Sequence, residues 1–145
     1  MLFLCTGNSA RSQMAEAILR HVSGGRVDVD SAGTAPQPDI HPMARRAVKT
    51  LLDLDMAGQY PKTLDQFLDR TFDYVITVCD RAAETCPAFP GDPERIHWSF
   101  ADPAAAKGTE AEQQRAFDAT ATQLLSRIRL WMSLPEVTRR VRTSP

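Results

Sequence analysis

The stretch Leu2-Phe3-Leu4-Cys5-Thr6-Gly7-Asn8-Ser9-Ala10-Arg11-Ser12 determines how the rest of the chain is arranged. It begins with a short apolar run typical of a buried strand and continues through small and polar residues typical of a turn. Residues 13–20 then combine high helix propensity with a helical spacing of apolar side chains. We therefore expect Cys5 at the end of a strand, and Arg11 and Ser12 at the start of a helix.

A loop of this kind is suited to binding a tetrahedral oxyanion. Its small residues let successive backbone N–H groups point inward and form a concave nest. The following helix adds unpaired N–H groups and the positive end of its dipole, and Arg11 can contact two oxygens of the anion at once. The residues predicted to bind the anion are Thr6, Gly7, Asn8, Ser9, Ala10 and Arg11.

Cys5 is the candidate nucleophile of this loop. Helix N-termini and neighbouring arginines lower the pKa of cysteine to roughly 3.5–7.5, and a thiolate held against a bound oxyanion can attack it. The alternative is a buried structural cysteine beside an unrelated arginine. The agreement of strand, turn, helix and C-x5-R spacing favours the catalytic interpretation.

Composition restricts the class of protein. The 145 residues suffice for one domain that buries about two thirds of its unfolded surface, and a formal net charge of −1 gives no indication of a nucleic-acid partner. No apolar run approaches the roughly 20 residues that span a bilayer, and no signal-peptide pattern is present. Three cysteines without such a signal indicate a reducing compartment, so we expect a cytoplasmic monomer without a membrane partner. The first strand is short, which leaves open a native start upstream of Met1.

Strands and helices are predicted to alternate along the chain. The predicted strands after the first cover residues 27–31, 74–78 and 95–98. The predicted helices cover residues 42–52 and 109–131, with a brief helix capped by Thr63 or Asp65 between them. The last helix is expected to bury Phe117, Leu124, Leu125, Ile128 and Trp131. Residues 80–92 lack clear periodicity. Residues 135–145 form a basic tail, expected to be a solvated or partly ordered extension of a domain that spans residues 1–134.

This alternation predicts an α/β fold with a parallel sheet and helices on both of its faces. Ligands of such sheets bind outside the carboxyl ends of the strands. Cys5, Cys79 and Asp102 each follow the end of a predicted strand, so we expect them at one edge of the sheet. Asp102 is the candidate general acid, because a departing oxygen needs a proton. The alternative is a turn aspartate, since Asp-Pro is a common turn pair.

Cys79 and Cys86 form the second candidate constellation. Their spacing does not match a paired zinc-ligand set, and the three histidines, His21, His41 and His97, are scattered, so we expect no metal site of that kind. The structural alternative is one buried strand-end thiol and one incidental loop thiol. The functional alternative is a thiol relay, in which Cys86 lies on a segment that can move for disulfide exchange.

These residues resemble the signature loop of low-molecular-weight protein tyrosine phosphatases and of the arsenate reductases that share their fold. The run Cys5-Thr6-Gly7-Asn8-Ser9-x-Arg11-Ser12-Gln13-Met14-Ala15-Glu16 is similar to the reductase version, which often has a second cysteine where this chain has Ala10. The stretch from Thr77 to Pro87 resembles that of thioredoxin-coupled arsenate reductases. The resemblance extends from Leu2 to about Trp131.

The resemblance implies a single-domain, three-layer sandwich with four parallel strands in the order 2-1-3-4, and a role in arsenic detoxification. Arsenate, mimicked by phosphate or sulfate, would be attacked by Cys5 while Asp102 protonates the departing oxygen. Cys79 would then attack Cys5, Cys86 would attack Cys79, and thioredoxin would reduce the final disulfide. By the same resemblance, Ser12 supports the Cys5 thiolate and Asn8 orders the loop.

The resemblance also implies a potassium site in some relatives, at positions matching Asn8, Glu16 and Ser31. A further acidic ligand of that site falls around residues 60–63, where this chain has none. No tightly bound cofactor is expected, and thioredoxin is the implied electron donor.

Two other functions remain open at this stage. A phosphatase for phosphotyrosine or small phosphoesters would need only Cys5, Arg11 and Asp102. Ala104-Ala105-Ala106 follows Asp102 and Pro103, whereas tyrosine phosphatases of this fold usually have aromatic side chains there. A non-catalytic oxyanion-binding module is the second alternative, and the presence of a nucleophile, an acid and two relay thiols argues against it.

Overall fold

Four short parallel strands form one sheet in the part of the chain that the computed structural model describes, residues 1–84 and 86–143. The strands are β1 (Leu2–Cys5), β2 (Asp30–Gly33), β3 (Tyr74–Thr77) and β4 (Glu94–His97). Their order is β2-β1-β3-β4, as predicted. β1 is central, and its Phe3 pairs with Ser31 on one side and Ile76 on the other. All residues of β1 and β3 are buried, which explains why their sequences are apolar throughout.

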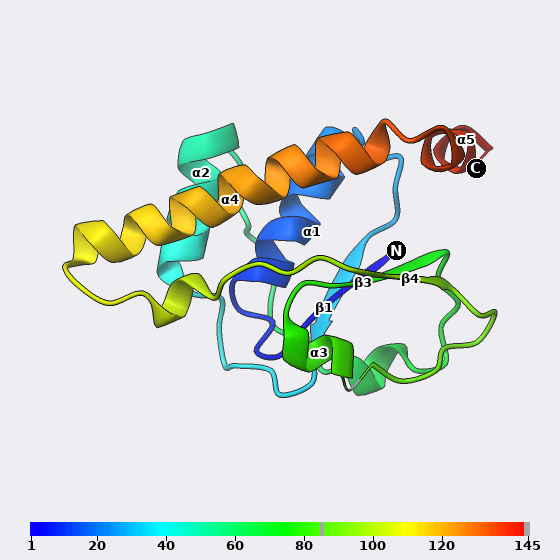
Figure 1. The fold of residues 1–145 in the computed structure, drawn as a ribbon, viewed down its shortest axis with the longest axis horizontal. Helices are drawn as coiled ribbons and strands as arrows, with labels where there is room; N and C mark the ends of the chain where they lie inside the picture. The colour runs from blue at the N-terminus through cyan, green and yellow to red at the C-terminus, as the bar shows by residue number, and fades with distance from the viewer. Residues whose placement is uncertain (85, 144–145) are drawn as a thin grey trace.

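Helices lie on both sides of this sheet (Figure 1), which confirms the predicted α/β class. The three long helices that pack together above the sheet in this view are α1 (Arg11–Val22), α2 (Pro42–Leu52) and α4 (Glu110–Met132). The short elements below it are α3 (Asp80–Glu84) and the 3-10 helix η1 (Leu64–Phe67). A second 3-10 helix, η2 (Pro103–Ala105), precedes α4, and α5 (Pro135–Thr143) follows it.

Local sequence signals account for the helix boundaries. α2 begins with Pro42 at its first position, and the His41 ring accepts a hydrogen bond from the backbone of Met43. α4 begins with a capping box in which Thr109 and Glu112 bind each other's backbone N–H groups. The predicted stripe of α4 is buried at every position, Phe117, Leu124, Leu125, Ile128 and Trp131. This long helix therefore covers α1 and α2 and closes the core.

The second strand differs from the prediction. Residues 27–31 alternate like a strand, but β2 starts only at Asp30 and ends at Gly33. Its register is set by β1, because Leu2 pairs with Asp30 and Cys5 pairs with Gly33. Pairing with a central strand therefore overrides the weak strand propensity of these small residues.

The carboxyl-terminal segment also differs from a solvated extension. Residues 135–143 form α5, and Val137 is only 1% exposed. The Arg140 guanidinium lies 4.8 Å from the centre of the Tyr74 ring. Helix α5 therefore packs onto the body of the fold, although the predicted boundary at residues 134–135 stays a prediction. No helix among the described residues has the length and apolar character that a membrane span requires.

Candidate active site

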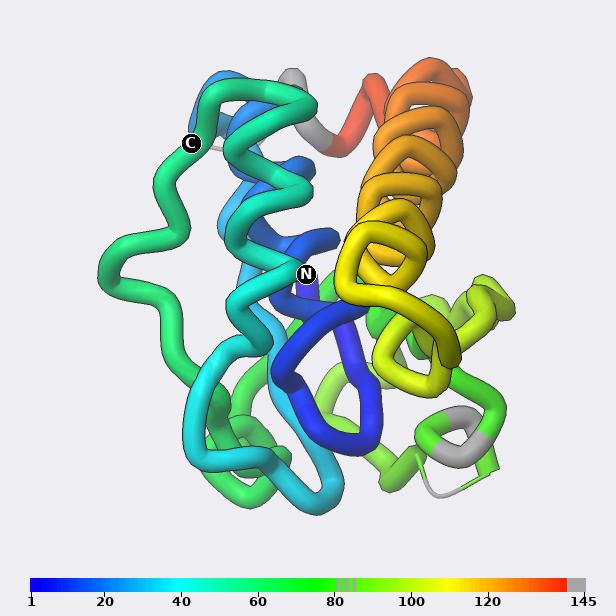
Figure 2. The backbone as a smooth tube through the Cα atoms, turned by 90° about the vertical axis from the view of Figure 1, so that its left-hand side faces the viewer, coloured from blue at the N-terminus to red at the C-terminus, as the bar shows by residue number. Residues whose placement is uncertain are grey.

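A pocket of about 670 Å³ opens at the carboxyl edge of the sheet. Its lining includes the whole loop from Cys5 to Arg11, together with Asp102 and Ala104. Figure 2 shows the dark-blue loop between the cyan segment that leads to α2 and the yellow segment that leads to α4. The structure thus brings together the predicted nucleophile, anion loop and acid.

Asn8 holds the shape of this loop. It is fully buried and has a φ of 47°, in the left-handed region that few non-glycine residues adopt. Its Nδ2 donates to Ser12 Oγ (2.8 Å) and Ser31 Oγ (3.0 Å). Its Oδ1 accepts from Gln13 Nε2 and from the backbone N–H of Lys62, both at 2.9 Å. Gln13 and Lys62 are not among the residues predicted from the sequence, although Lys62 lies within the range 60–63 where the implied potassium site would have its further ligand.

Gly33 explains why the loop can approach β2 so closely. A Cβ atom at this position would lie 2.5 Å from the backbone oxygen of Thr6 and 3.0 Å from the Cβ of Asn8. Both contacts are shorter than real Cβ atoms tolerate comfortably. Only glycine therefore allows the loop to rest against the end of β2.

The start of α1 leaves hydrogen-bond donors for an anion. Ala10 precedes the helix, and its side chain cannot accept a hydrogen bond. The N-cap residue therefore leaves the first N–H groups of α1 without a side-chain partner. Arg11 Nη1 donates to the backbone oxygen of Phe100 (3.0 Å), and Arg11 Nη2 lies 3.9 Å from Asp102 Oδ2. Arg11 Nε is buried without a hydrogen-bond partner among the described residues. A bound oxyanion would satisfy such donors.

Asp102 lines the same pocket and is the N-terminal cap of η2. Its Oδ1 accepts from the backbone N–H of Ala104 at 3.0 Å, whereas its Oδ2 faces Arg11. The side chain is half exposed, at 48%. Asp102 is therefore both a turn residue and a pocket carboxylate, so the two interpretations of the sequence are compatible.

Cys5 and Cys79 are both buried and reduced. Thr6 Oγ1 lies 3.4 Å from Cys79 Sγ, which places Cys79 directly behind the loop. The pKa of Cys79 is lowered to about 5 by a hydrogen bond with Cys5 and by hydrogen bonds from Thr6 and Ala82. The pKa of Cys5 is raised, by the same hydrogen bond and by burial. The predicted lowering of the Cys5 pKa is therefore not seen in the ligand-free protein, in which Cys5 and Cys79 share a hydrogen bond.

Cys86 lies apart from the other two thiols. It lines a small cavity of about 150 Å³ with side chains of β3 and β4, and neither Cys5 nor Cys79 belongs to that lining. Its thiol makes a long contact of 3.8 Å with the backbone oxygen of Pro87, and burial raises its pKa. The structure thus brings together two of the three predicted relay thiols.

A chain of polar contacts fixes the start of the segment that follows Cys79. Asp80, the first residue of α3, accepts from His97 Nε2 (2.8 Å) and from Ser99 Oγ (3.3 Å). The other ring nitrogen of His97 contacts Thr77 Oγ1 at 2.7 Å. These hydrogen bonds lower the pKa of the Asp80 carboxyl group. The end of β4 therefore anchors the start of α3, a long-range link that sequence reasoning missed.

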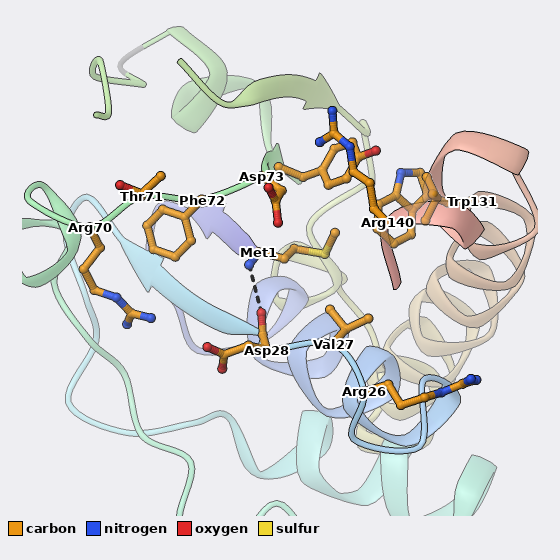
Figure 3. A pocket seen from close by; sticks show the side chains of 12 residues that line it. Met1, Arg26, Val27, Asp28, Arg70, Thr71, Phe72, Asp73, Trp131 and Arg140 are labelled. Atoms are coloured by element: carbon orange, nitrogen blue, oxygen red, sulfur yellow. Dashed lines mark hydrogen bonds between the residues drawn. The ribbon is translucent and has the colours of Figure 1, made fainter. Parts of the chain in front are cut away.

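A second pocket, of about 250 Å³, lies at the amino edge of the sheet (Figure 3). The Met1 amine donates to the backbone oxygen of Asp28 (2.8 Å) inside it, and Arg26, Arg70 and Arg140 surround it. It contains none of the predicted site residues. Among the described residues, no group of three or more His, Cys, Asp or Glu side chains has the arrangement of a metal site.

Comparison with known proteins agrees with this geometry. A family model described as low molecular weight phosphotyrosine protein phosphatase matches residues 1–142. An arsenate reductase of Halalkalibacterium halodurans is 42% identical over 127 residues, which cover 88% of this chain and 90% of the relative. An arsenate reductase of Bacillus subtilis is 38% identical over 127 residues, with the same coverage of 88% and 90%.

Solved structures are similar as well. A thioredoxin-dependent arsenate reductase of Corynebacterium glutamicum has a TM-score of 0.61 and 31% identity, and the match covers 90% of this chain and 61% of that one. A low molecular weight protein tyrosine phosphatase of T. tengcongensis has a TM-score of 0.71, with 92% and 97% coverage. Its identity of 23% supports the shared fold alone.

Proposed function

The chain belongs to the low molecular weight phosphotyrosine protein phosphatase family, and from this premise we propose that it is an arsenate reductase regenerated by thioredoxin. The observation that carries the proposal is the second thiol behind the oxyanion loop, Cys79, at 3.4 Å from Thr6 Oγ1. Hydrolysis of a phosphate ester needs one thiol, whereas reduction of arsenic by the protein needs two. The names of the curated relatives support the same assignment.

In the proposed first step, arsenate binds to the N–H groups of the loop and to Arg11. The hydrogen bond between Cys5 and Cys79 lets the proton of Cys5 move to Cys79, so that the Cys5 thiolate forms beside Arg11 and the positive end of α1. The Cys5 thiolate attacks arsenic, one As–O bond breaks, and the departing oxygen leaves as water with a proton from Asp102. Ser12, which accepts a hydrogen bond from Asn8, retains a hydroxyl proton to stabilise the Cys5 thiolate.

The second step reduces arsenic. Cys79 loses its proton and attacks the Cys5 sulfur, the electron pair of the S–As bond moves to arsenic, and arsenite leaves. Two thiolates are thereby oxidised to a Cys5–Cys79 disulfide as arsenic gains two electrons. Cys86 then attacks Cys79, which releases the Cys5 thiolate and forms a Cys79–Cys86 disulfide that thioredoxin reduces.

The last exchange requires the segment from Asp80 to Cys86 to move. A disulfide needs Cα atoms within about 7 Å and facing Cβ atoms, whereas Cys86 faces a separate cavity in the reduced protein. We propose that α3 rearranges when the Cys79–Cys86 disulfide forms. The same assignment implies a cytoplasmic monomer whose partners are arsenate and thioredoxin. No alkali cation enters the mechanism, because the Lys62 ammonium lies beside the carboxylate that would bind it.

The alternative function is that of a phosphatase for phosphotyrosine or small phosphoesters. It would use Cys5, Arg11 and Asp102 alone. Ala104 lines the pocket beside Asp102 and offers no aromatic surface for a substrate ring. Because phosphate and arsenate have nearly the same shape, we expect weak hydrolysis of phosphate esters as a side activity.

The deciding experiment compares both activities in Cys79→Ser. Arsenate-dependent oxidation of NADPH, coupled through thioredoxin and its reductase, is expected to stop in this variant, because no thiol resolves the Cys5 adduct. Hydrolysis of a chromogenic phosphate ester is expected to survive, and Cys5→Ser, the control, is expected to lose both. Continued arsenate reduction by Cys79→Ser would contradict the relay. Parallel assays with glutaredoxin and mycothiol systems identify the reductant.

A further inference from the structure

Glu16 is a buried carboxylate that is connected to the oxyanion loop through Ser31. Its side chain is 4% exposed, and its Oε1 accepts a hydrogen bond from Ser31 Oγ at 2.9 Å. Ser31 Oγ in turn accepts from Asn8 Nδ2 at 3.0 Å. Two hydrogen bonds therefore connect the charge of Glu16 to the residue that holds the loop. A buried carboxylate is costly unless a cation neutralises it.

Two cations flank Glu16, one on each oxygen. The Lys62 ammonium lies 3.6 Å from Oε1, and its side chain is 10% exposed. Arg20 Nη2 lies 3.2 Å from Oε2, but the Arg20 side chain is 48% exposed. Solvent weakens the second ion pair more than the first, so Lys62 is the main buried counter-ion of Glu16.

Lys62 is held firmly in this position. Its ammonium donates to the backbone oxygen of Tyr60 (3.1 Å), and its backbone oxygen accepts from the N–H of Gly33 (2.8 Å). Its backbone N–H donates to Asn8 Oδ1. The same residue therefore contacts Asn8 through its backbone and neutralises Glu16 through its side chain.

The potassium ion implied by the family resemblance does not fit these residues. Asn8 Oδ1 already accepts two N–H groups, and Ser31 Oγ accepts from Asn8 while it donates to Glu16. The Lys62 ammonium occupies the side of Glu16 Oε1 that such a cation would need. A metal ion beside this ammonium would experience like-charge repulsion.

We propose that the Lys62 ammonium is a built-in cation that takes the place of a bound alkali metal ion and orders the oxyanion loop through Glu16, Ser31 and Asn8. Lys62 is a positioning residue, because it does not line the pocket. The affinity of the loop for oxyanions is then independent of potassium in this chain. If the ammonium is removed and the rest of the network is kept, the affinity of the loop for oxyanions becomes dependent on potassium.

The test compares the wild type with Lys62→Met, which keeps the length of the side chain and removes its charge. Melting temperatures and phosphate dissociation constants are measured in potassium, sodium and tetramethylammonium chloride at equal ionic strength. The wild type is expected to give the same values in all three salts. Lys62→Met is expected to melt about 10 °C lower in tetramethylammonium, to bind phosphate more weakly, and to recover both properties in potassium.

Two controls separate this role from a general loss of charge. Lys49→Met removes an exposed ammonium that pairs with Asp53 at 2.7 Å on the surface, and it is expected to show no salt preference. Lys62→Arg keeps the charge and is expected to restore phosphate binding without potassium. A potassium-specific rise in the melting temperature of the wild type would overturn the proposal, as would equal behaviour of Lys62→Met and Lys49→Met. If Lys62→Met does not fold in any salt, the proposal is decided by the salt dependence of the wild type and by the phosphate affinity of Lys62→Arg.

Discussion

Cys5 and Cys79 share a hydrogen bond, and we expect Cys79 to carry a thiolate while the loop is empty. Because the pKa of Cys79 is lowered to about 5, the thiolate is present above that pH and is lost as the pH falls through it. The ultraviolet absorbance of thiolate, followed against pH, is expected to rise with a midpoint near 5 in the wild type.

Two variants assign this titration. Cys5→Ala removes the hydrogen-bond donor that contributes most to the low pKa of Cys79, so its midpoint is expected to move to higher pH. Cys86→Ser is the control and is expected to keep the acidic midpoint, since burial raises the pKa of Cys86. An acidic midpoint that survives in Cys79→Ser would assign the thiolate to Cys5 instead.

Asp102→Asn tests whether the Asp102 side chain is the general acid. Asparagine keeps the cap on the N–H of Ala104 but cannot supply a proton. We expect turnover of arsenate to fall by about 10²–10⁴-fold, with phosphate affinity largely unchanged in calorimetric titration. Asp39→Asn is the matched control, because Asp39 lines the same pocket but is 80% exposed. Unchanged turnover in Asp102→Asn would remove the carboxylate from the mechanism.

At the scale of elements, α3 is expected to control how fast Cys79 meets Cys86. Asp80 anchors α3 to His97 and Ser99. Because the pKa of its carboxyl group is lowered, this contact is fully present at pH values above the usual pKa of aspartate, and it weakens as the pH falls through the lowered pKa. Asp80→Asn is expected to speed formation of the Cys79–Cys86 disulfide during mild oxidation, measured by alkylation and mass spectrometry. Glu84→Gln, at an exposed position of the same helix, is the control. Equal rates in the two variants would show that the anchor does not limit the rearrangement.

The sequence alone predicts the elements whose signals are local. The strand–loop–helix unit around Cys5 and the boundaries of α2 and α4 follow from apolar spacing, proline and capping residues. β2 is displaced from its expected position because its register depends on pairing with β1. α3 is missed because its anchor comes from the end of β4. Elements that depend on distant partners are thus the ones that local patterns misplace.

The same distinction holds for the site. The loop from Cys5 to Arg11 is visible in the sequence because its residues are contiguous, and Asp102 is visible because it follows a strand. The contacts of Asn8 with Lys62 and of Arg11 with Phe100 join residues 54 and 89 positions apart. No local pattern indicates such pairs. The hydrogen bond between Cys5 and Cys79, which shifts the pKa values of both thiols, likewise joins residues that are distant in the sequence.

For the molecule as a whole, α5 is expected to contribute to stability rather than to extend into solvent. Val137 is 1% exposed, so Val137→Ala removes two buried carbon atoms and is expected to lower the free energy of unfolding by about 2 kcal/mol. Urea unfolding followed by circular dichroism measures this change. Glu136→Ala, at an exposed position of α5, is expected to have little effect. Equal stabilities of the two variants would mean that α5 does not pack on the fold.

The two tryptophans of the chain determine what intrinsic fluorescence can report. Trp98 and Trp131 are both buried, and their ring centres lie 6.3 Å apart. Trp131 also meets Tyr74 edge-on at 5.2 Å, and neither tryptophan lines the pocket that holds the oxyanion loop. Their emission therefore belongs to the contact between the sheet and α4. It will respond strongly when the chain unfolds and weakly when an anion binds, so ligand titrations of this protein need an introduced optical probe or calorimetry.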